Sequence, residues 1–156
     1  MSTNAASIKA FMRKELNEDY IVEIPGIKTF SDKNGNPIPL KIRAITTADL
    51  TRIRKACHVR KIAKDAKGKP IFNNGAVQYD DQYDANAMTD QMIAEALVFP
   101  DLHDKELLNF YGCNEAAELV HKLFQRFDDY TYISGKISEV SGISTDGDEI
   151  IEEAKN

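Results

Sequence analysis

The chain has 156 residues, 42% apolar and 29% charged, which is enough for one globular domain with a core of its own. No apolar run is long enough for a membrane-spanning helix, and the N-terminus lacks the apolar stretch of a secretion signal. The net charge of −5 hides an asymmetry: residues 1–78 carry 15 Lys and Arg against 7 Asp and Glu, and residues 79–156 carry 5 against 18. Such polarity suits an oppositely charged partner, a nucleic acid at one end, or copies of the chain in head-to-tail contact, although the halves can also neutralise each other within one fold.

The first residues predict a short helix followed by a β-hairpin. Ser7 can cap the helix, because its side chain can accept a hydrogen bond from a free backbone N–H. The apolar stripe of this helix consists of Ile8, Phe11, Met12 and Leu16. Apolar and polar residues then alternate around Val22 and again around Ile42, with Asn34-Gly35 as turn residues between them. We therefore predict two paired antiparallel strands within residues 20–44.

A second helix and a second hairpin are expected next. Thr46 and Asp49 have the spacing of a capping box, with Asp in place of the usual Glu, and predict a helix that fades near Lys64. A hairpin is expected over residues 70–79, because turn residues separate two short apolar stretches. These turn residues are Asn73, Asn74 and Gly75.

From about Asn86 the apolar residues recur three and four positions apart, which is typical of helices. Four helices are predicted: one ending at Phe99-Pro100, one from Asp104 to Gly112, one capped by Asn114, and a last one ending at Gly142. The predicted fold class is therefore α+β, with a small antiparallel sheet from the N-terminal hairpins packed with a C-terminal set of amphipathic helices. We expect one domain over residues 1–142 and an acidic, flexible C-terminal extension over residues 143–156.

The sequence lacks the motifs of common catalytic and cofactor sites. Ser134 and Ser141 do not stand in a Gly-x-Ser-x-Gly elbow, and there is no P-loop or dinucleotide fingerprint. Cys57, Cys113 and the three histidines are too scattered to indicate a metal site, so the cysteines are expected to be buried thiols. We predict a protein without cofactor or catalytic activity. An enzyme of unknown type is an alternative that only this lack of motifs opposes.

Residues 52–69 form a basic segment with eight Lys and Arg and one acidic residue, Asp65. The candidate phosphate contacts are Arg52, Arg54, Lys55, Arg60, Lys61 and Lys64. Because the segment has no aromatic residue for base stacking, a solvated helix face or a face that meets an acidic partner is the favoured interpretation. A small nucleic-acid-binding or regulatory protein is the alternative, which steeply salt-dependent binding to DNA or RNA would support.

Five segments follow one another at characteristic spacing over most of the chain. They are SIKAFMRKEL, PLKIRAITTADLTRIRKAC, FPDLHDKELLNFYGCNEAAELVHKLF, GKISEVSGI and the ending EEAKN. In this order they resemble the XkdN-like tail assembly chaperones of tailed bacteriophages and related prophages of Gram-positive bacteria. The family has no catalytic signature, so the resemblance rests on the succession of segments.

The resemblance implies a non-enzymatic chaperone that binds the phage tape-measure protein, keeps its apolar helices soluble and helps to deliver tail-tube subunits. It also implies action in the cytoplasm of a Gram-positive host and absence from the mature virion. Self-association through the opposite charge halves is a further interpretation. Six apolar residues are candidate partner contacts where the structure exposes several of them together, and core residues otherwise. They are Met88, Met92, Leu123, Phe124, Tyr130 and Ile133.

The last three residues suggest a second, longer product. Families with this function commonly use programmed ribosomal frameshifting near the end of the shorter reading frame. Ala154-Lys155-Asn156 can be encoded GCA AAA AAC, which contains the slippery heptamer A AAA AAC. We therefore expect this chain to be the shorter product. The gene sequence tests this expectation: an AAG codon for Lys155, or no open frame downstream, would contradict it.

Overall fold

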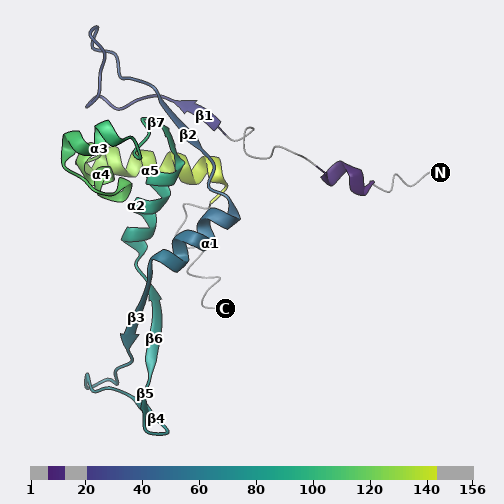
Figure 1. Cartoon of the computed structure of the whole chain (residues 1–156), viewed down its shortest axis with the longest axis vertical. Coiled ribbons are helices and arrows are strands. Elements are labelled where there is room, and N and C mark those ends of the chain that lie inside the picture. Colours follow the sequence, from purple (N-terminus) through teal and green to yellow (C-terminus); the bar gives the residue numbers. More distant parts are fainter. Residues whose placement is uncertain (1–6, 13–20, 144–156) are drawn as a thin grey trace.

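A computed structural model describes residues 7–12 and 21–143 and confirms the α+β class (Figure 1). The elements in chain order are η1 (Ile8–Phe11), β1 (Ile21–Ile24), β2 (Leu40–Arg43), α1 (Thr47–Ala56), β3 (His58–Ile62), β4 (Phe72–Asn73), β5 (Ala76–Val77), β6 (Tyr79–Tyr83), α2 (Ala85–Ala96), β7 (Leu97–Phe99), α3 (Lys105–Tyr111), α4 (Ala116–Leu123) and α5 (Phe127–Ser141). Residues 144–156, with the expected slip site and nearly all of the predicted extension, lie outside the described residues.

The N-terminal helix is a single 3₁₀ turn in the described part of the chain. Ser7 caps it as predicted, because its hydroxyl accepts a hydrogen bond from the backbone N–H of Lys9 at 3.3 Å. The large apolar side chains of this turn, Ile8 and Phe11, are at least 70% exposed. Leu16, the last member of the predicted stripe, lies outside the described residues.

The predicted first hairpin is confirmed as β1 and β2, the first two strands of a three-stranded antiparallel sheet ordered β1-β2-β7. Ile24 lies opposite Leu40, and both side chains are buried. The third strand, β7, was not predicted from the sequence. The helix expected to end at Phe99-Pro100 ends instead at Ala96, and Leu97 pairs with Ile42 of β2. Phe99 stands before a proline, which disfavours helical geometry and leaves this stretch free to join the sheet edge.

The predicted capping box is confirmed at the start of α1. The Thr46 hydroxyl accepts a hydrogen bond from the Asp49 N–H, and the Asp49 carboxylate accepts one from the Thr46 N–H, both at 3.1 Å. The expected end of this helix near Lys64 is wrong, because α1 ends at Ala56 and the chain continues as β3. Antiparallel pairing of β3 with β6, which begins 21 residues further on, overrides the local helix preference of this basic stretch.

Residues 58–83 form a long two-stranded projection, which we call the arm (Figure 1). Its ladder runs from His58 opposite Tyr83 to Ile62 opposite Tyr79. The second hairpin predicted from the sequence is the tip of this arm, where β4 pairs with β5. Asn74 and Gly75 make its two-residue turn with φ values of 51° and 79°, a backbone conformation that Asn and Gly tolerate.

Helices α2, α4 and α5 pack with the sheet around the core. The fully buried large side chains are Ile42, Ile93, Leu102, Leu119, Val120, Ile133 and Ile137. Asp104 caps α3, and Gly112 and Gly142 end α3 and α5 in the left-handed conformation, as predicted. The predicted cap at Asn114 is wrong, because Glu115 precedes the first turn of α4 and the Asn114 N–H donates to Glu118 Oε2 at 3.4 Å.

Candidate functional site

An apolar pocket of about 300 Å³ lies between the loop of the β1–β2 hairpin, the end of β7, helix α3 and the end of α4. Its lining residues are Phe30, Ile38, Leu40, Phe99, Pro100, Leu107, Phe110, Tyr111, Leu123 and Phe124. The pocket opens to solvent, since Phe110 is 79% exposed and Phe99 is 52% exposed. Exposed aromatic side chains beside a hollow are typical of surfaces that bind another molecule.

The periodicity of α3 explains the exposure of Phe110. Leu107, Leu108 and Tyr111 form the stripe that packs on the core, and Phe110 falls outside it. The Phe110 and Tyr111 rings pack in a T-shaped arrangement with a centroid distance of 5.0 Å, which supports Phe110 at the rim of the pocket. Neither Phe99 nor Phe110 is among the partner contacts predicted from the sequence. The signal that could have found Phe110 is a large apolar residue outside the stripe of an amphipathic helix.

Three carboxylates stand beside the pocket, in a second hollow that shares Phe99, Pro100, Leu107 and Phe110 with it. We call this set, Asp101, Asp104 and Glu106, the acidic flank. Two of its members are held by local hydrogen bonds: Asp101 Oδ1 accepts from the His103 N–H, and Asp104 Oδ1 accepts from the Leu107 N–H, both at 3.0 Å. The flank therefore places fixed negative charge next to exposed apolar surface.

The structure divides the six candidate partner contacts between the pocket and other positions. Leu123 and Phe124 line the floor of the apolar pocket and are almost fully buried. Ile133 is fully buried in the core, and Met88 and Met92 are half-buried on α2. Partner binding by these six residues stays a prediction, and core packing accounts for the position of Ile133.

Tyr130, the sixth candidate, belongs to a polar cluster on α2, α4 and α5. Its hydroxyl donates to Asp90 Oδ1 at 2.8 Å, and His121 Nε2 lies 2.7 Å from Asp90 Oδ2. The Tyr130 and His121 rings are stacked at 5.8 Å. Burial, together with the hydrogen bond to Asp90, raises the pKa of Tyr130 above its usual range. These contacts tie the three helices together.

The predicted basic face is distributed over two elements rather than one helix. Arg52, Arg54 and Lys55 lie on α1, Arg60 and Lys61 lie on β3, and Lys64 follows β3. In the arm, Arg60 and Lys61 stand opposite Asp81 and Asp80 of β6, so neighbouring acidic residues offset their charge. The fold also supplies the aromatic partners that the segment lacks in sequence, because the Arg60 guanidinium lies 4.0 Å from the centre of the Tyr79 ring.

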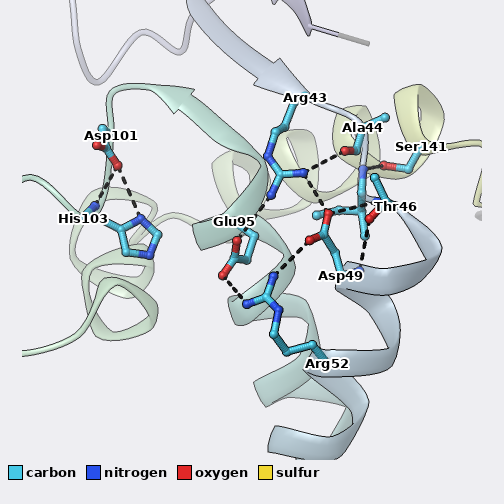
Figure 2. A network of polar contacts seen from close by, with 10 residues as sticks. Arg43, Ala44, Thr46, Asp49, Arg52, Glu95, Asp101, His103 and Ser141 are labelled. Atoms are coloured by element: carbon cyan, nitrogen blue, oxygen red, sulfur yellow. Dashed lines mark hydrogen bonds and ion pairs between the residues drawn. The ribbon is translucent and has the colours of Figure 1, made fainter. Parts of the chain in front are cut away.

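A network of charged side chains anchors α1 to the sheet and to α2 (Figure 2). Arg43 of β2 contacts Asp49 at 2.8 Å and Glu95 of α2 at 3.3 Å. Arg52 contacts the same two carboxylates, at 3.0 Å and 2.9 Å. Because α1 leads directly into β3, this network fixes the helix from which the arm projects. The Ser141 hydroxyl at the end of α5 also accepts a hydrogen bond from the Ile45 N–H at 2.8 Å.

Hydrogen bonds in this network lower the pKa values of both carboxylates. Burial alone would raise the pKa of Asp49, but the hydrogen bonds from Arg43 and from Thr46 outweigh burial and hold it well below its usual range. The hydrogen bond from Arg52 lowers the pKa of Glu95, against the smaller opposing effect of burial. Both groups are therefore charged at neutral pH and stabilise the fold as anions.

Asp49→Asn is expected to lower the free energy of unfolding by about 2 kcal/mol at pH 7, because it removes the charge that faces Arg43 and Arg52. The folded-state pKa of Asp49 lies below its unfolded value, so this stabilisation is complete above about pH 5 and is lost as the pH falls further. Urea denaturation of the wild type and of Asp49→Asn measures the difference between their free energies of unfolding. This difference should be smaller at pH 3 than at pH 7 by about 1 kcal/mol. An unchanged difference at the two pH values would contradict the ion-pair explanation.

Both cysteines are buried and free, as expected from their spacing. Across residues 7–12 and 21–143, no group of three His, Cys, Asp or Glu side chains is placed to hold a metal ion. In the same ranges no helix has the length and apolar character needed to cross a bilayer.

Comparisons with known proteins identify the family. Residues 8–155 match the family described as phage XkdN-like tail assembly chaperone protein, TAC. The chain is 26% identical over 153 residues to the phage-like element PBSX protein XkdN of Bacillus subtilis strain 168, covering 98% of this chain and 96% of that protein. It is 28% identical over 146 residues to the uncharacterized protein YqbN of the same strain, covering 94% and 91%. The crystal structure of a protein named YqbN has the same fold, with a TM-score of 0.65 at 22% identity over 88% of this chain and 98% of that one. The chain therefore belongs to the XkdN-like family of phage tail assembly chaperones.

Proposed function

We propose that this chaperone binds apolar helical segments of the tape-measure protein of its own phage or prophage, and that the apolar pocket is the binding surface. The proposal includes no catalytic step. It places the protein in the cytoplasm of a Gram-positive host, where it would assist the addition of tail-tube subunits and leave before the virion is complete. The observation that carries the proposal is the open apolar pocket with the exposed rings of Phe99 and Phe110 at its rim.

The chemistry of the pocket suits a client recognised by apolar surface. The lining is apolar apart from the Tyr111 hydroxyl and contains no ionisable carboxylate, amine or guanidinium. Binding at such a site is driven by removal of apolar area from water, at about 25 cal/mol per Å², and does not require one particular polar group on the client. An amphipathic helix can insert side chains spaced three and four positions apart into a hollow of this kind. The same pocket could therefore accept many segments of one long, repetitive helical protein.

The acidic flank would affect both the solubility of the chaperone and its choice of client. Asp101, Asp104 and Glu106 place negative charge on one side of the exposed apolar surface. Negative charge at the rim of a binding surface keeps the chaperone soluble with and without a bound client. It also favours clients that carry basic residues beside their apolar stripe. A chaperone that holds an aggregation-prone helix benefits from both effects.

Co-expression tests the proposal. The tape-measure protein encoded by the same phage or prophage is produced alone, with this chain, and with an unrelated acidic protein of similar size. We expect its soluble fraction to rise only with this chain, and the two proteins to copurify. Overlapping synthetic peptides of the tape-measure protein should then locate apolar segments that bind. A tape-measure protein that stays equally insoluble in all three cultures, with no peptide bound, would contradict the proposal.

The same preparation tests the alternative of a nucleic-acid-binding protein. Arg54 and Arg60 lie near the rings of Tyr83 and Tyr79, a combination found on surfaces that stack bases. Binding of labelled single-stranded RNA or DNA that weakens steeply between 50 and 200 mM salt, as is typical of phosphate contacts, would favour this alternative.

A further inference from the structure

The turn η1 carries three large apolar side chains that are exposed to solvent. Ile8, Phe11 and Met12 are between 70% and 76% exposed. A single helical turn is not stable in water by itself, because its few hydrogen bonds do not offset the loss of backbone freedom. Burial of one large apolar side chain contributes about 1.5–3 kcal/mol. Residues 7–12, which we call the N-terminal segment, therefore favour contact with an apolar surface elsewhere.

The N-terminal segment has the chemistry expected of a client. Phe11 and Met12 follow Ile8 by three and four positions, the spacing at which an amphipathic helix inserts side chains into a hollow. Lys9 belongs to the same turn, and the segment contains no Asp or Glu. The pocket carries the matching combination, an apolar hollow beside the acidic flank. The two surfaces are thus complementary in apolar character and in charge.

The N-terminal segment is attached close to the pocket of its own molecule. Strand β1 begins at Ile21, and the pocket residue Leu40 pairs with Ile24 of the same strand. The path along β1 and across to β2 places Ile21 and Leu40 about 11 Å apart. Residues 13–20 connect the segment to β1, and a chain of this length spans up to about 27 Å. The segment can therefore reach the pocket without a second molecule.

We propose that the N-terminal segment docks in the apolar pocket of its own molecule and is displaced when a client binds. Phe11 and Met12 would provide the apolar contact, and Lys9 would face the acidic flank. The contact would cover the exposed rings of Phe99 and Phe110 in the absence of a client. The inference rests on the same pocket as the proposed function, and it adds an internal competitor that every client has to displace.

The connection to β1 sets the strength of this competition. A connection of this length gives a tethered group an effective concentration on the order of 1 mM at its site. With a dissociation constant of about 0.5 mM for the contact itself, the segment fills the pocket in about two-thirds of the molecules. The apparent dissociation constant of a client then rises about threefold. Weakly binding segments are excluded, whereas a strong client still displaces the N-terminal segment.

Paramagnetic broadening of NMR signals tests the contact in the full chain. A nitroxide is attached at Ala10→Cys, an exposed position of the N-terminal segment, while the two native cysteines are buried. In isotope-labelled protein we expect the amide signals of Leu107 and Phe110 to broaden. Phe11→Asp should remove most of this broadening, because an apolar hollow does not accommodate an unpaired carboxylate. Phe127→Asp, at a side chain that is 80% exposed and does not line the pocket, is the control and should leave the broadening unchanged.

A mixed sample distinguishes contact within one molecule from contact between molecules. Unlabelled chains that carry the nitroxide are mixed with an equal amount of isotope-labelled chains without it. We expect the pocket signals of the labelled chains to stay sharp. Broadening as strong as in the first sample would assign the N-terminal segment to the pocket of a second molecule and would overturn the inference. Pocket signals that broaden equally with and without Phe11→Asp would overturn it as well.

A charge exchange tests the predicted orientation of the N-terminal segment. Lys9→Glu places a negative charge against the acidic flank, and Glu106→Lys makes the flank less acidic. Each change alone should lessen the broadening of the pocket signals, because like charges oppose the contact or opposite charges are lost. The two changes in one chain should restore it. A double variant that broadens no more than the single variants would contradict the placement of Lys9 at the acidic flank.

Client affinity measures the competition itself. Phe11→Asp should lower the dissociation constant of a tape-measure peptide about threefold, because the internal competitor is lost. A synthetic peptide of residues 7–16, added to the Phe11→Asp chain, should compete with the tape-measure peptide and raise this constant again. The control Phe127→Asp should bind the tape-measure peptide like the wild type. A dissociation constant that Phe11→Asp leaves unchanged would show that the N-terminal segment does not compete with clients.

The proposed function and this inference can fail independently. Pocket signals that are broadened by the nitroxide and sharpened by Phe11→Asp, without binding of any tape-measure peptide, would contradict the proposed function alone. Tape-measure peptides that bind equally well to the wild type and to Phe11→Asp, with no broadening at the pocket, would contradict the inference alone.

Discussion

Phe110→Asp is expected to weaken binding of tape-measure segments at least tenfold while leaving the stability of the chaperone within about 0.5 kcal/mol of the wild type. The side chain is 79% exposed, so its replacement removes little buried area and creates no cavity. In the complex, a carboxylate at this position would be buried against an apolar client without a partner, which is costly. Fluorescence anisotropy with a labelled client peptide measures the affinity, and urea denaturation measures the stability.

The control for this prediction is Phe127→Asp. Phe127, at the first position of α5, is 80% exposed and has no part in lining the pocket. It therefore matches Phe110 in residue type and exposure and differs in location. Equal loss of client binding in both variants would show that general surface hydrophobicity, and not the pocket, holds the client. No loss in either variant would remove the pocket from the proposed function.

Ile133→Ala is expected to lower the free energy of unfolding by about 2–5 kcal/mol, the range for large-to-small changes in a packed core. Ile133 is fully buried on α5, and it belongs to the core cluster that joins α2, α4 and the sheet. The measurement is urea denaturation followed by circular dichroism. Client affinity per folded molecule should be unchanged, because this side chain does not line the pocket.

The matched control for Ile133→Ala is Ile8→Ala, the same substitution at a side chain that is 70% exposed. Its effect on stability should stay within about 0.5 kcal/mol. If Ile133→Ala left stability unchanged and weakened client binding, the interpretation of Ile133 as a partner contact would be supported over its role in the core.

The features that the sequence predicted correctly depend on neighbours in the chain. The capping box of Thr46 and Asp49 is a pair of hydrogen bonds within one helical turn, so a motif of four consecutive residues is enough to predict it. Gly112 and Gly142 end their helices because the left-handed backbone conformation there favours glycine. The Asn74-Gly75 turn follows the same rule. Similarity to the XkdN-like family, suggested by the order of segments, was confirmed over residues 8–155.

The features that the sequence missed depend on distant partners. Residues 58–62 are compatible with a helix, and only pairing with Tyr79–Tyr83 makes them a strand. Residues 97–99 follow a helix without a glycine to mark its end, and they become a strand because β2 offers a free edge. The pocket is harder still to predict, because its lining comes from four separate parts of the chain. The periodic pattern of one helix predicts which side chains point away from the core. It does not predict which other segments of the chain lie next to those side chains.

At the base of the arm the Asp84 N–H donates to the Cys57 carbonyl oxygen at 3.0 Å, next to the paired residues His58 and Tyr83. The core cluster takes none of its members from residues 58–83. The arm is therefore a separate projection whose two strands join the folded body side by side. Changes in its length or sequence do not alter the packing of the core, so evolution can modify it rapidly while the folded body stays constant. Among related phages, the arm is where we expect the sequences to diverge most in length.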